Sequence, residues 1–365
     1  MSIVKLLTYA ACLAVVNPNV VAAEFSTAGK ASLILTGGQV YTPDGSVEAI
    51  AVDGKGVLKQ RARLCLRWYR WYEGDDASEA ADASAVMIAS RNSYARDRLA
   101  LDCVKIMLDG VPTDSHTAAM LEPYAGTVHG RDDEASRTGL LMVEQDVLNS
   151  VTTVFDRQGL TVKFHAAGDA TVRAGLDAIE AARTANGFSG QLHDVGHCTF
   201  VSRVDIPRAR KIAATFEVSP YLWAPSPIND SITAAIGDER IDREWPIREM
   251  IDSGALVVPG SDWSVVPSVN PWIGIETLIT REIPGDDSGK SFGKAEAISL
   301  DEAIAMYTVN SARHVGVSHK IGRIEVGMVA DVIVVDQDPY QIPTRDLHKT
   351  KVTMTIINGG IVYSR

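Results

Sequence analysis

The sequence predicts an α/β protein built around a parallel sheet or barrel. Strand-like and helix-like segments alternate through most of the chain, which favours this class over all-α or all-β folds. Both ends have a different texture, with short strand-like runs joined by glycine-containing turns over residues 32–57 and 330–365. In the middle, four successive strand-like segments contain or precede Lys105, His165, His197 and Asp262. The position of these four residues at or near strand ends points to a site with chemical activity there.

Length and charge limit the kinds of partner. A chain of 365 residues with 46% hydrophobic content can bury one large core or two. Its formal net charge of -11 argues against nucleic acid, because a phosphate backbone requires a basic surface. The sequence also contains no run of lysine and arginine and no basic amphipathic helix that would favour a membrane surface.

Residues 1–23 are predicted to be an export signal. Lys5 precedes an apolar core over residues 6–16, and small residues come directly before Glu24. The alternative, a membrane anchor, needs about 20 continuous apolar residues, and the polar residues 17–19 interrupt this stretch. We therefore expect a periplasmic or secreted protein without a stable membrane span after the signal is removed.

The cysteines do not suggest a disulfide framework. After loss of the signal, Cys65, Cys103 and Cys198 remain, an odd number without short spacings. Cys103 and Cys198 lie in or beside predicted strands, so we expect both to be buried free thiols.

The two ends are predicted to form one small β domain. Gly-Gly and Asp-Gly turns join the short strands of residues 32–57, and residues 330–339 and 352–365 have a matching pattern. Since chain termini often lie close together, we predict a composite β domain from residues 24–57 plus 320–365. Residues 58–319 would then be the barrel domain, inserted between the two halves.

Helical signals follow the strands of this middle portion. After His165, residues 170–183 place Val172, Leu176 and Ile179 on one helical face. A later helix is expected to begin at Ser299, which has Glu302 at the spacing of a capping box. Repeated strand–helix units are typical of a parallel sheet or barrel.

The remaining segments are predicted with less regular structure. We expect loops over residues 123–139, 219–230 and 281–294. The first two would lie near the strand ends, where loops determine substrate choice, and the third is interpreted as a solvated connector. Residues 57–100 fit the alternating pattern poorly, with one strand over 63–69 and a helix over 77–99.

His165 and His197 are candidate metal ligands. Each ends a predicted strand, and a neutral imidazole is a good zinc ligand whose second nitrogen is usually held by an acceptor. Asp169 is the candidate acceptor for His165. His193 shares a strand face with His197 and is a candidate supporting group. The alternative for each histidine is a hydrogen-bonded structural role.

Asp262 follows an apolar predicted strand over residues 255–261. A carboxylate in this position can bind a metal ion and accept a proton from metal-bound water. Trp223 and Trp263 are candidate walls of a substrate pocket, although aromatic side chains also line cores.

Lys105 lies among apolar residues, where an unpaired ammonium is costly to bury. Burial lowers the pKa of a lysine, and the neutral amine could react with carbon dioxide to form a carbamate that bridges two metal ions. The residues alone favour the alternative, a lysine that faces solvent or pairs with Asp109 or Glu122.

The ordered motifs over residues 105–124, 164–183, 196–198, 259–282 and 299–339 resemble the amidohydrolase superfamily, and more narrowly amidohydrolase family 3, the YtcJ-like metal-dependent hydrolases. The resemblance implies a (β/α)8-type barrel with a composite β domain. It also implies zinc or another divalent metal, with Lys105 as a carbamylated bridging ligand, His165 and His197 as paired imidazoles, and Asp262 as ligand and general base. The implied substrate is a small amide-type molecule attacked by metal-activated water.

The chain departs from this family at the start of the barrel. The His-x-His pair expected on the first barrel strand is absent, and the early strands are missing with it near residues 57–61. Without this pair, a site for a single metal ion is the expectation. Two expectations follow: an exported metal-dependent amidohydrolase acting on C–N bonds other than peptide bonds, or a non-catalytic relative that regulates production of secreted exoenzymes. A homo-oligomer is compatible with either. No G-x-S-x-G elbow supports a serine hydrolase.

Overall fold

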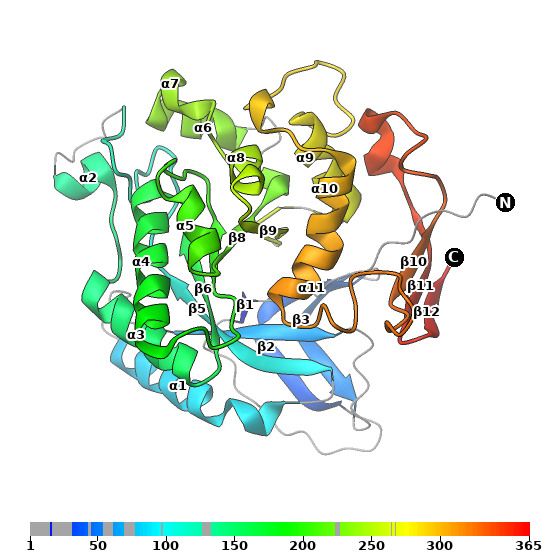
Figure 1. The fold of residues 1–365 in the computed structure, drawn as a ribbon, viewed down its shortest axis with the longest axis horizontal. Helices are drawn as coiled ribbons and strands as arrows, with labels where there is room; N and C mark the ends of the chain where they lie inside the picture. The colour runs from blue at the N-terminus through cyan, green and yellow to red at the C-terminus, as the bar shows by residue number, and fades with distance from the viewer. Residues whose placement is uncertain are drawn as a thin grey trace. The chain divides into compact units, whose positions relative to one another are not determined.

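The computed structural model describes residues 15–16, 31–42, 45–53, 61–68, 77–95, 98–125, 133–222, 227–263, 265–266 and 268–365 (Figure 1). The chain divides into two compact units. Unit 1 comprises Met1–Ala10, Met107–Gln158 and Phe164–Arg365, and unit 2 comprises Ala11–Ile106 and Gly159–Lys163. The predicted division into a composite β domain and a barrel domain stays a prediction.

Unit 2 contains a β-hairpin, a short parallel sheet and one long helix. The hairpin pairs β2 and β3 in antiparallel fashion, and β4 pairs in parallel with both β1 and β5. The strand predicted over residues 63–69 is confirmed, whereas the predicted helix ends earlier and continues as one 3₁₀ turn. The elements are β1 (Val15–Val16), β2 (Ala31–Thr42), β3 (Gly45–Asp53), β4 (Ala62–Arg67), α1 (Ala77–Ser90), η2 (Arg91–Tyr94) and β5 (Leu99–Met107), whose last residue belongs to unit 1.

A disulfide joins β4 to β5 and corrects the expectation for one cysteine. Cys65 and Cys103 are register partners on these neighbouring strands, and their side chains are bonded. Cys103 is therefore not a free thiol, because strand pairing brings it against a cysteine that lies 38 positions earlier in the sequence. Cys198 is buried, as expected, and its thiol donates to the Val195 carbonyl at 3.1 Å instead of forming a disulfide.

Replacing Cys65 by serine is expected to lower the free energy of unfolding by about 3–4 kcal/mol, the chain-entropy contribution for a closed loop of this length. Denaturant unfolding of oxidised wild type, reduced wild type and Cys65→Ser would measure the loss. The reduced wild type should match the variant, and equal stability of all three would show that the bond contributes nothing.

Unit 1 carries parallel strands whose carboxyl ends point the same way. β7 pairs with β8, and β8 with β9, all in parallel, with His197 opposite Val218 and Val218 opposite Pro259. The strands are β6 (Thr161–Ala166, of which the last three residues belong to unit 1), β7 (Asp194–His197), β8 (Thr215–Val218) and β9 (Leu256–Pro259). Parallel strands alternating with helices confirm the predicted α/β, barrel-type class.

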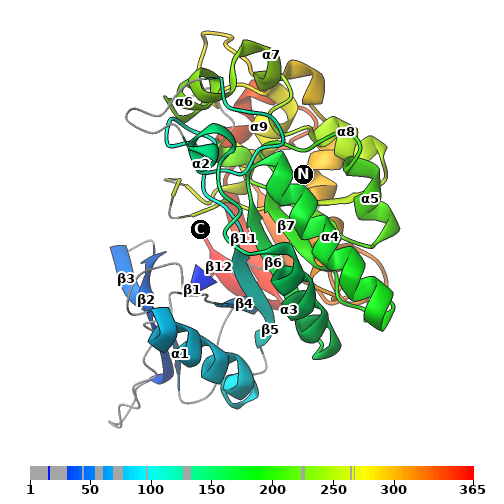
Figure 2. The ribbon, with the colours of Figure 1, turned by 90° about the vertical axis from the view of Figure 1, so that its left-hand side faces the viewer.

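Helices connect these strands, and α3 and α4 lie side by side in both views (Figures 1 and 2). The predicted stripe Val172, Leu176 and Ile179 on α4 is fully buried. The α-helices are α2 (Glu134–Thr138), α3 (Gln145–Arg157), α4 (Asp169–Asn186), α5 (Ile206–Lys211), α6 (Pro227–Ile236), α7 (Asp238–Ile241), α8 (Ile247–Asp252), α9 (Pro271–Thr280), α10 (Leu300–Ala305) and α11 (Ser311–His314). The capping box of Ser299 and Glu302 is present at the start of α10.

Two features interrupt the predicted pattern in this region. The helix that begins at Leu300 passes through a π-helical turn, η5 (Met306–Asn310), before α11. The predicted loop 123–139 contains α2, and the predicted loop 219–230 contains the 3₁₀ turn η3 (Pro220–Leu222) and the start of α6. Side-chain capping explains α2, because the Asp133 carboxylate accepts from the Ser136 N–H.

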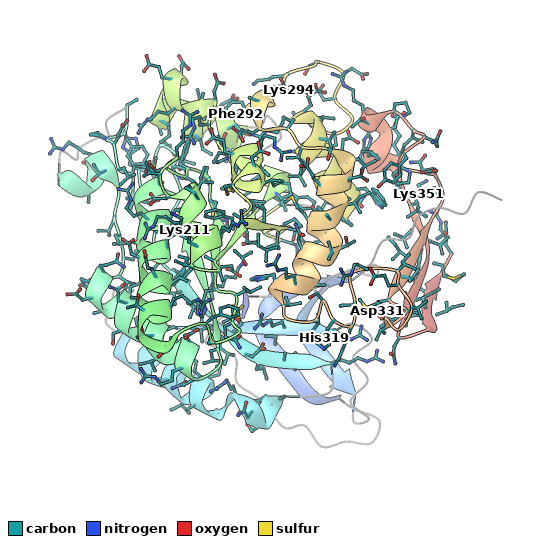
Figure 3. All side chains as sticks on the ribbon, in the orientation of Figure 1. Lys211, Phe292, Lys294, His319, Asp331 and Lys351 are labelled. Atoms are coloured by element: carbon teal, nitrogen blue, oxygen red, sulfur yellow. A yellow bond between two sulfur atoms is a disulfide. The ribbon has the colours of Figure 1, made fainter. Side chains whose placement is uncertain are left out.

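The connector 281–294 is fixed at its base rather than fully solvated. Arg281 is buried and donates to the carbonyl groups of Phe292 and Glu244 at 2.9 Å each. Lys294, labelled near Phe292 in Figure 3, begins the 3₁₀ turn η4 (Lys294–Glu296). Its ammonium donates to the Thr280 carbonyl at 2.5 Å. The buried guanidinium of Arg281 thus joins the two ends of the loop. The prediction of a solvated connector is therefore wrong for the ends of residues 281–294.

The end of the chain forms a three-stranded antiparallel sheet, as the sequence predicts. Its strands are β10 (Val332–Val335), β11 (Val352–Ile357) and β12 (Gly360–Ser364), and the 3₁₀ helix η6 (Thr344–Lys349) precedes β11. The buried carboxylate of Asp331 accepts from the Asn358 N–H at 2.7 Å and fixes the turn before β12 (Figure 3).

The predicted export signal lies mostly outside the described residues; within it, Val15–Val16 pair with β4. In the part of the chain that the structure describes, no helix combines the length and apolar character needed to cross a membrane.

Candidate functional site

The carboxyl ends of β6 and β7 place two imidazoles together. The ring centroids of His165 and His197 are 4.3 Å apart, and their planes are inclined by 57°. Backbone hydrogen bonds fix the strand ends that present them. The Leu108 N–H donates to the His165 carbonyl at 3.2 Å, and the Cys198 N–H donates to the Ala166 carbonyl at 3.0 Å. The sequence prediction that these histidines share a site agrees with this geometry.

The ring of His165 is oriented by acceptors on one side. Its Nε2 lies 2.9 Å from the Gly110 carbonyl oxygen and 3.6 Å from Oδ1 of Asp109. A carbonyl oxygen only accepts, so Nε2 carries the proton of the neutral ring. The lone pair then lies on Nδ1, the nitrogen through which His165 would coordinate a metal ion.

Asp109 is the site residue that sequence reasoning missed. It directly follows β5 and is fully buried. Its carboxylate accepts from the backbone N–H groups of Ala167, Gly168 and Ala119 at 3.0, 2.9 and 3.1 Å, and from the Thr171 hydroxyl at 2.6 Å. Burial raises its pKa to about 7, although these hydrogen bonds oppose the rise. The available signal was an aspartate at a strand end, which reads equally well as a turn residue.

His197 and Asp262 have positive φ angles of 70° and 55°. Non-glycine residues seldom adopt this region, and such conformations gather at functional sites when the surrounding structure enforces them. Asp262 is half-buried and follows β9, and its carbonyl accepts from the Val265 N–H at 2.9 Å in a tight turn. Trp263 is half-buried beside it, while Trp223 lies outside the described residues.

Lys105 lies on β5 in unit 2 and is 3% exposed. The alternative of a lysine facing solvent is therefore wrong, because both neighbours along its strand are also buried. Its carbamylation and its role as a ligand remain predictions.

The two supporting residues expected near the histidines make other contacts. Asp169 begins α4, where its carboxylate accepts from the Leu121 N–H at 2.8 Å and anchors a loop. Asp109 stands beside His165 in the position foreseen for Asp169. His193 precedes β7 at its amino end, whereas His197 ends the strand.

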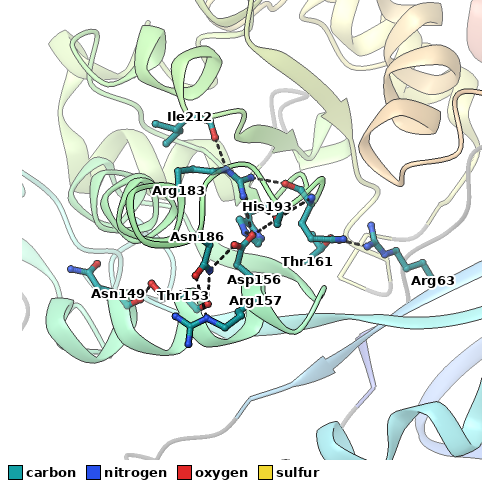
Figure 4. A network of polar contacts seen from close by, with 12 residues as sticks. Arg63, Asn149, Thr153, Asp156, Arg157, Thr161, Arg183, Asn186, His193 and Ile212 are labelled. Carbon is teal, nitrogen blue, oxygen red and sulfur yellow. Dashed lines mark hydrogen bonds and ion pairs between the residues drawn. The ribbon is translucent and has the colours of Figure 1, made fainter.

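His193 belongs to a polar cluster with Asp156, Arg183, Asn186 and Ser189, which we call the Asp156 cluster (Figure 4). Asp156 and His193 are buried, Arg183 and Asn186 are half-buried, and Ser189 is exposed. The carboxylate of Asp156 accepts from His193 Nε2 at 2.9 Å, from Arg183 at 2.9 Å and from Asn186 at 2.8 Å, and also from the Ser189 hydroxyl. The amino ends of barrel strands generally serve stability, so this cluster is interpreted as structural.

The donor groups fit part of a metal site. Two imidazoles at 4.3 Å centroid spacing suit a divalent transition metal. Among the described residues, however, no group of three or more histidine, cysteine, aspartate or glutamate side chains is arranged to hold an ion. The described side chains alone do not make a complete site.

These observations define the class of the protein as a barrel-type α/β fold with paired imidazoles at its strand ends. Residues 54–363 match the amidohydrolase family Amidohydro_3, and the chain belongs to this family. It is 28% identical over 262 residues to YtcJ of Bacillus subtilis (strain 168), which is named as an amidohydrolase, covering 72% of this chain and 47% of YtcJ.

Two further matches extend the comparison. The chain is 33% identical over 124 residues to the N-substituted formamide deformylase of Arthrobacter pascens, covering 33% of this chain and 22% of that enzyme. Its fold is similar to the crystal structure of an uncharacterized metal-dependent hydrolase from Pyrococcus furiosus, with a TM-score of 0.59 and 23% identity over 79% of this chain and 53% of the other. The chain spans about half the length of the curated relatives that it matches over most of its own length.

Proposed function

We propose that this protein is a hydrolase of C–N bonds other than peptide bonds, acting on small amide-type substrates. The observation that carries the proposal is the pairing of His165 and His197 at the carboxyl ends of adjacent strand segments. Active sites of barrel enzymes lie at this face. Membership of the amidohydrolase family and similarity to an N-substituted formamide deformylase support the substrate class.

In this proposal one divalent metal ion, zinc or another, is held by His165 and His197. Asp262 is the proposed third ligand and the group that accepts the proton of the attacking water, since a half-buried carboxylate at a strand end suits both roles. Lys105, carbamylated or not, is a proposed further ligand.

Export from the cell is proposed alongside the activity. The apolar segment of residues 6–16 followed by small residues supports a cleaved signal. The disulfide of Cys65 and Cys103 supports the same location, since such bonds persist in oxidising compartments. Amino-terminal sequencing of the protein recovered from periplasm and medium should find Glu24 as the first residue; an intact Met1 in the cytoplasm alone would refute export.

The activity is tested with a panel of N-formyl and N-acetyl amines, assayed for amine release by the full chain after incubation with zinc, cobalt or manganese. Wild type should release amine, and His165→Ala should lower the rate by at least about 100-fold because an imidazole at the reaction centre is lost. The exposed His319, labelled in Figure 3, offers a matched control. His319→Ala should retain the wild-type rate.

The second candidate function is that of a non-catalytic family member that regulates production of secreted exoenzymes. The absence of a three-ligand group among the described side chains favours it. Metal-loaded wild type that hydrolyses none of the panel, together with altered exoenzyme secretion on deletion of the gene, would support this candidate against the hydrolase.

A further inference from the structure

We propose that Asp109 is a positioning residue of the site, and that one of its two carboxylate oxygens adds to the stabilisation that the Gly110 carbonyl gives to the Nε2-protonated tautomer of His165. This inference rests on the proposed function, since it assigns Asp109 the task of presenting Nδ1 of His165 to a metal ion. Asp109 touches neither substrate nor ion in this account and acts through the imidazole.

The two oxygens of Asp109 have separate partners. Oδ2 accepts from the Ala119 N–H, the Gly168 N–H and the Thr171 hydroxyl, at 3.1, 2.9 and 2.6 Å. Oδ1 accepts from the Ala167 N–H at 3.0 Å and lies 3.6 Å from Nε2 of His165. Oδ2 therefore anchors the loop that contains Ala119 and the start of helix α4, while Oδ1 faces His165 and the backbone N–H of Ala167.

This arrangement favours one state of the ring. Nε2 of His165 donates its proton to the Gly110 carbonyl at 2.9 Å. Oδ1 of Asp109, at 3.6 Å, lies beyond hydrogen-bond distance and stabilises the same proton through its charge. Outer groups of this kind orient a histidine ligand, and their removal typically costs 10–100-fold in metal affinity.

The backbone around Asp109 leaves the carboxylate no other arrangement. A Cβ at Gly168 would lie 1.9 Å from the Ala119 carbonyl oxygen, so the turn after β6 must pass close to the loop that Asp109 binds. Helix α4 begins at the next residue, and its Thr171 is fully buried against the same carboxylate. The carboxylate as a whole is consequently held by contacts on three segments of the chain, through Ala119, Gly168 and Thr171 at Oδ2 and through Ala167, the neighbour of Gly168, at Oδ1.

Asp109→Asn separates the two roles. The side-chain oxygen of asparagine can keep the three partners of Oδ2. Its NH2 group then takes the place of Oδ1 and faces two other donors, the Ala167 N–H and the Nε2–H of His165, which it cannot accept from. The matched control is Thr171→Val, which removes one partner of Oδ2 and leaves the oxygen facing His165 unchanged.

The experiment is ¹⁵N–¹H correlation of the histidine rings in the metal-free full chain at alkaline pH, with His165→Gln for assignment, followed by zinc titration of each variant. Wild type and Thr171→Val should show His165 protonated on Nε2. Asp109→Asn should show a smaller Nε2-protonated population, since only the Gly110 carbonyl then favours it, and should bind zinc about 10–100-fold more weakly than wild type.

The outcomes are separable from those of the proposed function. If wild type itself shows His165 protonated on Nδ1, the positioning role is overturned even if Asp109→Asn does not fold. An unchanged tautomer in folded Asp109→Asn overturns it as well. If the tautomer depends on Asp109 but wild type binds no metal, the positioning role stands and the proposed metal-dependent hydrolysis fails.

Discussion

Replacement of Asp156 by alanine is expected to lower the free energy of unfolding by about 3–5 kcal/mol, the usual cost of removing one partner from a buried ion pair. Asp156 is 1% exposed, and its carboxylate binds Arg183 and His193 (Figure 4). Both lose this anionic partner in the variant, although Arg183 keeps its backbone acceptors. Chemical denaturation of the variant and of wild type measures the difference.

Asp146 on the same helix α3 provides the control. It is exposed in the first turn, where a carboxylate contributes less than about 1 kcal/mol through the helix dipole. Asp146→Ala should therefore cost much less than Asp156→Ala. Similar losses for the two variants would show that the Asp156 cluster is not a major source of stability.

The Asp156 cluster also predicts acid sensitivity. Burial lowers the pKa of His193, so the unfolded chain takes up a proton at a higher pH than the folded chain. Burial alone would raise the pKa of Asp156, but hydrogen bonds from His193, Ser189 and Asn186 outweigh it and hold the pKa well below its ordinary range. Both groups contribute stability at neutral pH, and it should fall as pH decreases below about 6.5 for the histidine and about 3.9 for the aspartate. In Asp156→Ala the fall in stability below about pH 3.9 should be smaller, whereas the fall below about pH 6.5 should remain, because the Asp156 contact opposes the lowering of the His193 pKa.

Asp262→Asn is expected to lower kcat by about 10²–10⁴-fold while leaving the unfolding midpoint unchanged. The predicted loss is that of a positioned general base, and the half-buried side chain at the end of β9 explains the small structural cost. Steady-state kinetics with the best substrate of the amide panel would measure it.

An exposed aspartate in the segment after β8 supplies the matched control. Asp230 lies on α6 and pairs only at the surface with Lys290, at 3.3 Å. Asp230→Asn should keep the wild-type kcat. A folded Asp262→Asn protein with wild-type kcat would exclude Asp262 as the proton acceptor.

The sequence predicted those parts of the molecule that depend on local patterns. Apolar periodicity placed α4, the capping box placed α10, and strand-end positions placed His165 and His197 at one face. Each of these signals lies within a few neighbouring residues. The class of fold followed from the alternation of such segments.

Contacts between distant segments escaped the sequence analysis. Cys103 was expected to be a free thiol because the cysteines lack short spacings and Cys103 lies in a predicted strand. Only the register of β4 against β5 revealed its partner. The role of Asp109 depends on the N–H groups of Ala119 and Ala167, one in a loop and one after another strand. No spacing rule in the sequence connects them.

The most direct test of the central claim is the metal content of the purified mature chain, measured by elemental analysis together with His197→Ala and His319→Ala. If His165 and His197 form a metal site, wild type and His319→Ala should hold about one divalent ion per chain, and His197→Ala should hold none. Wild type that remains free of metal after incubation with zinc would contradict the account, and so would equal metal content in His197→Ala.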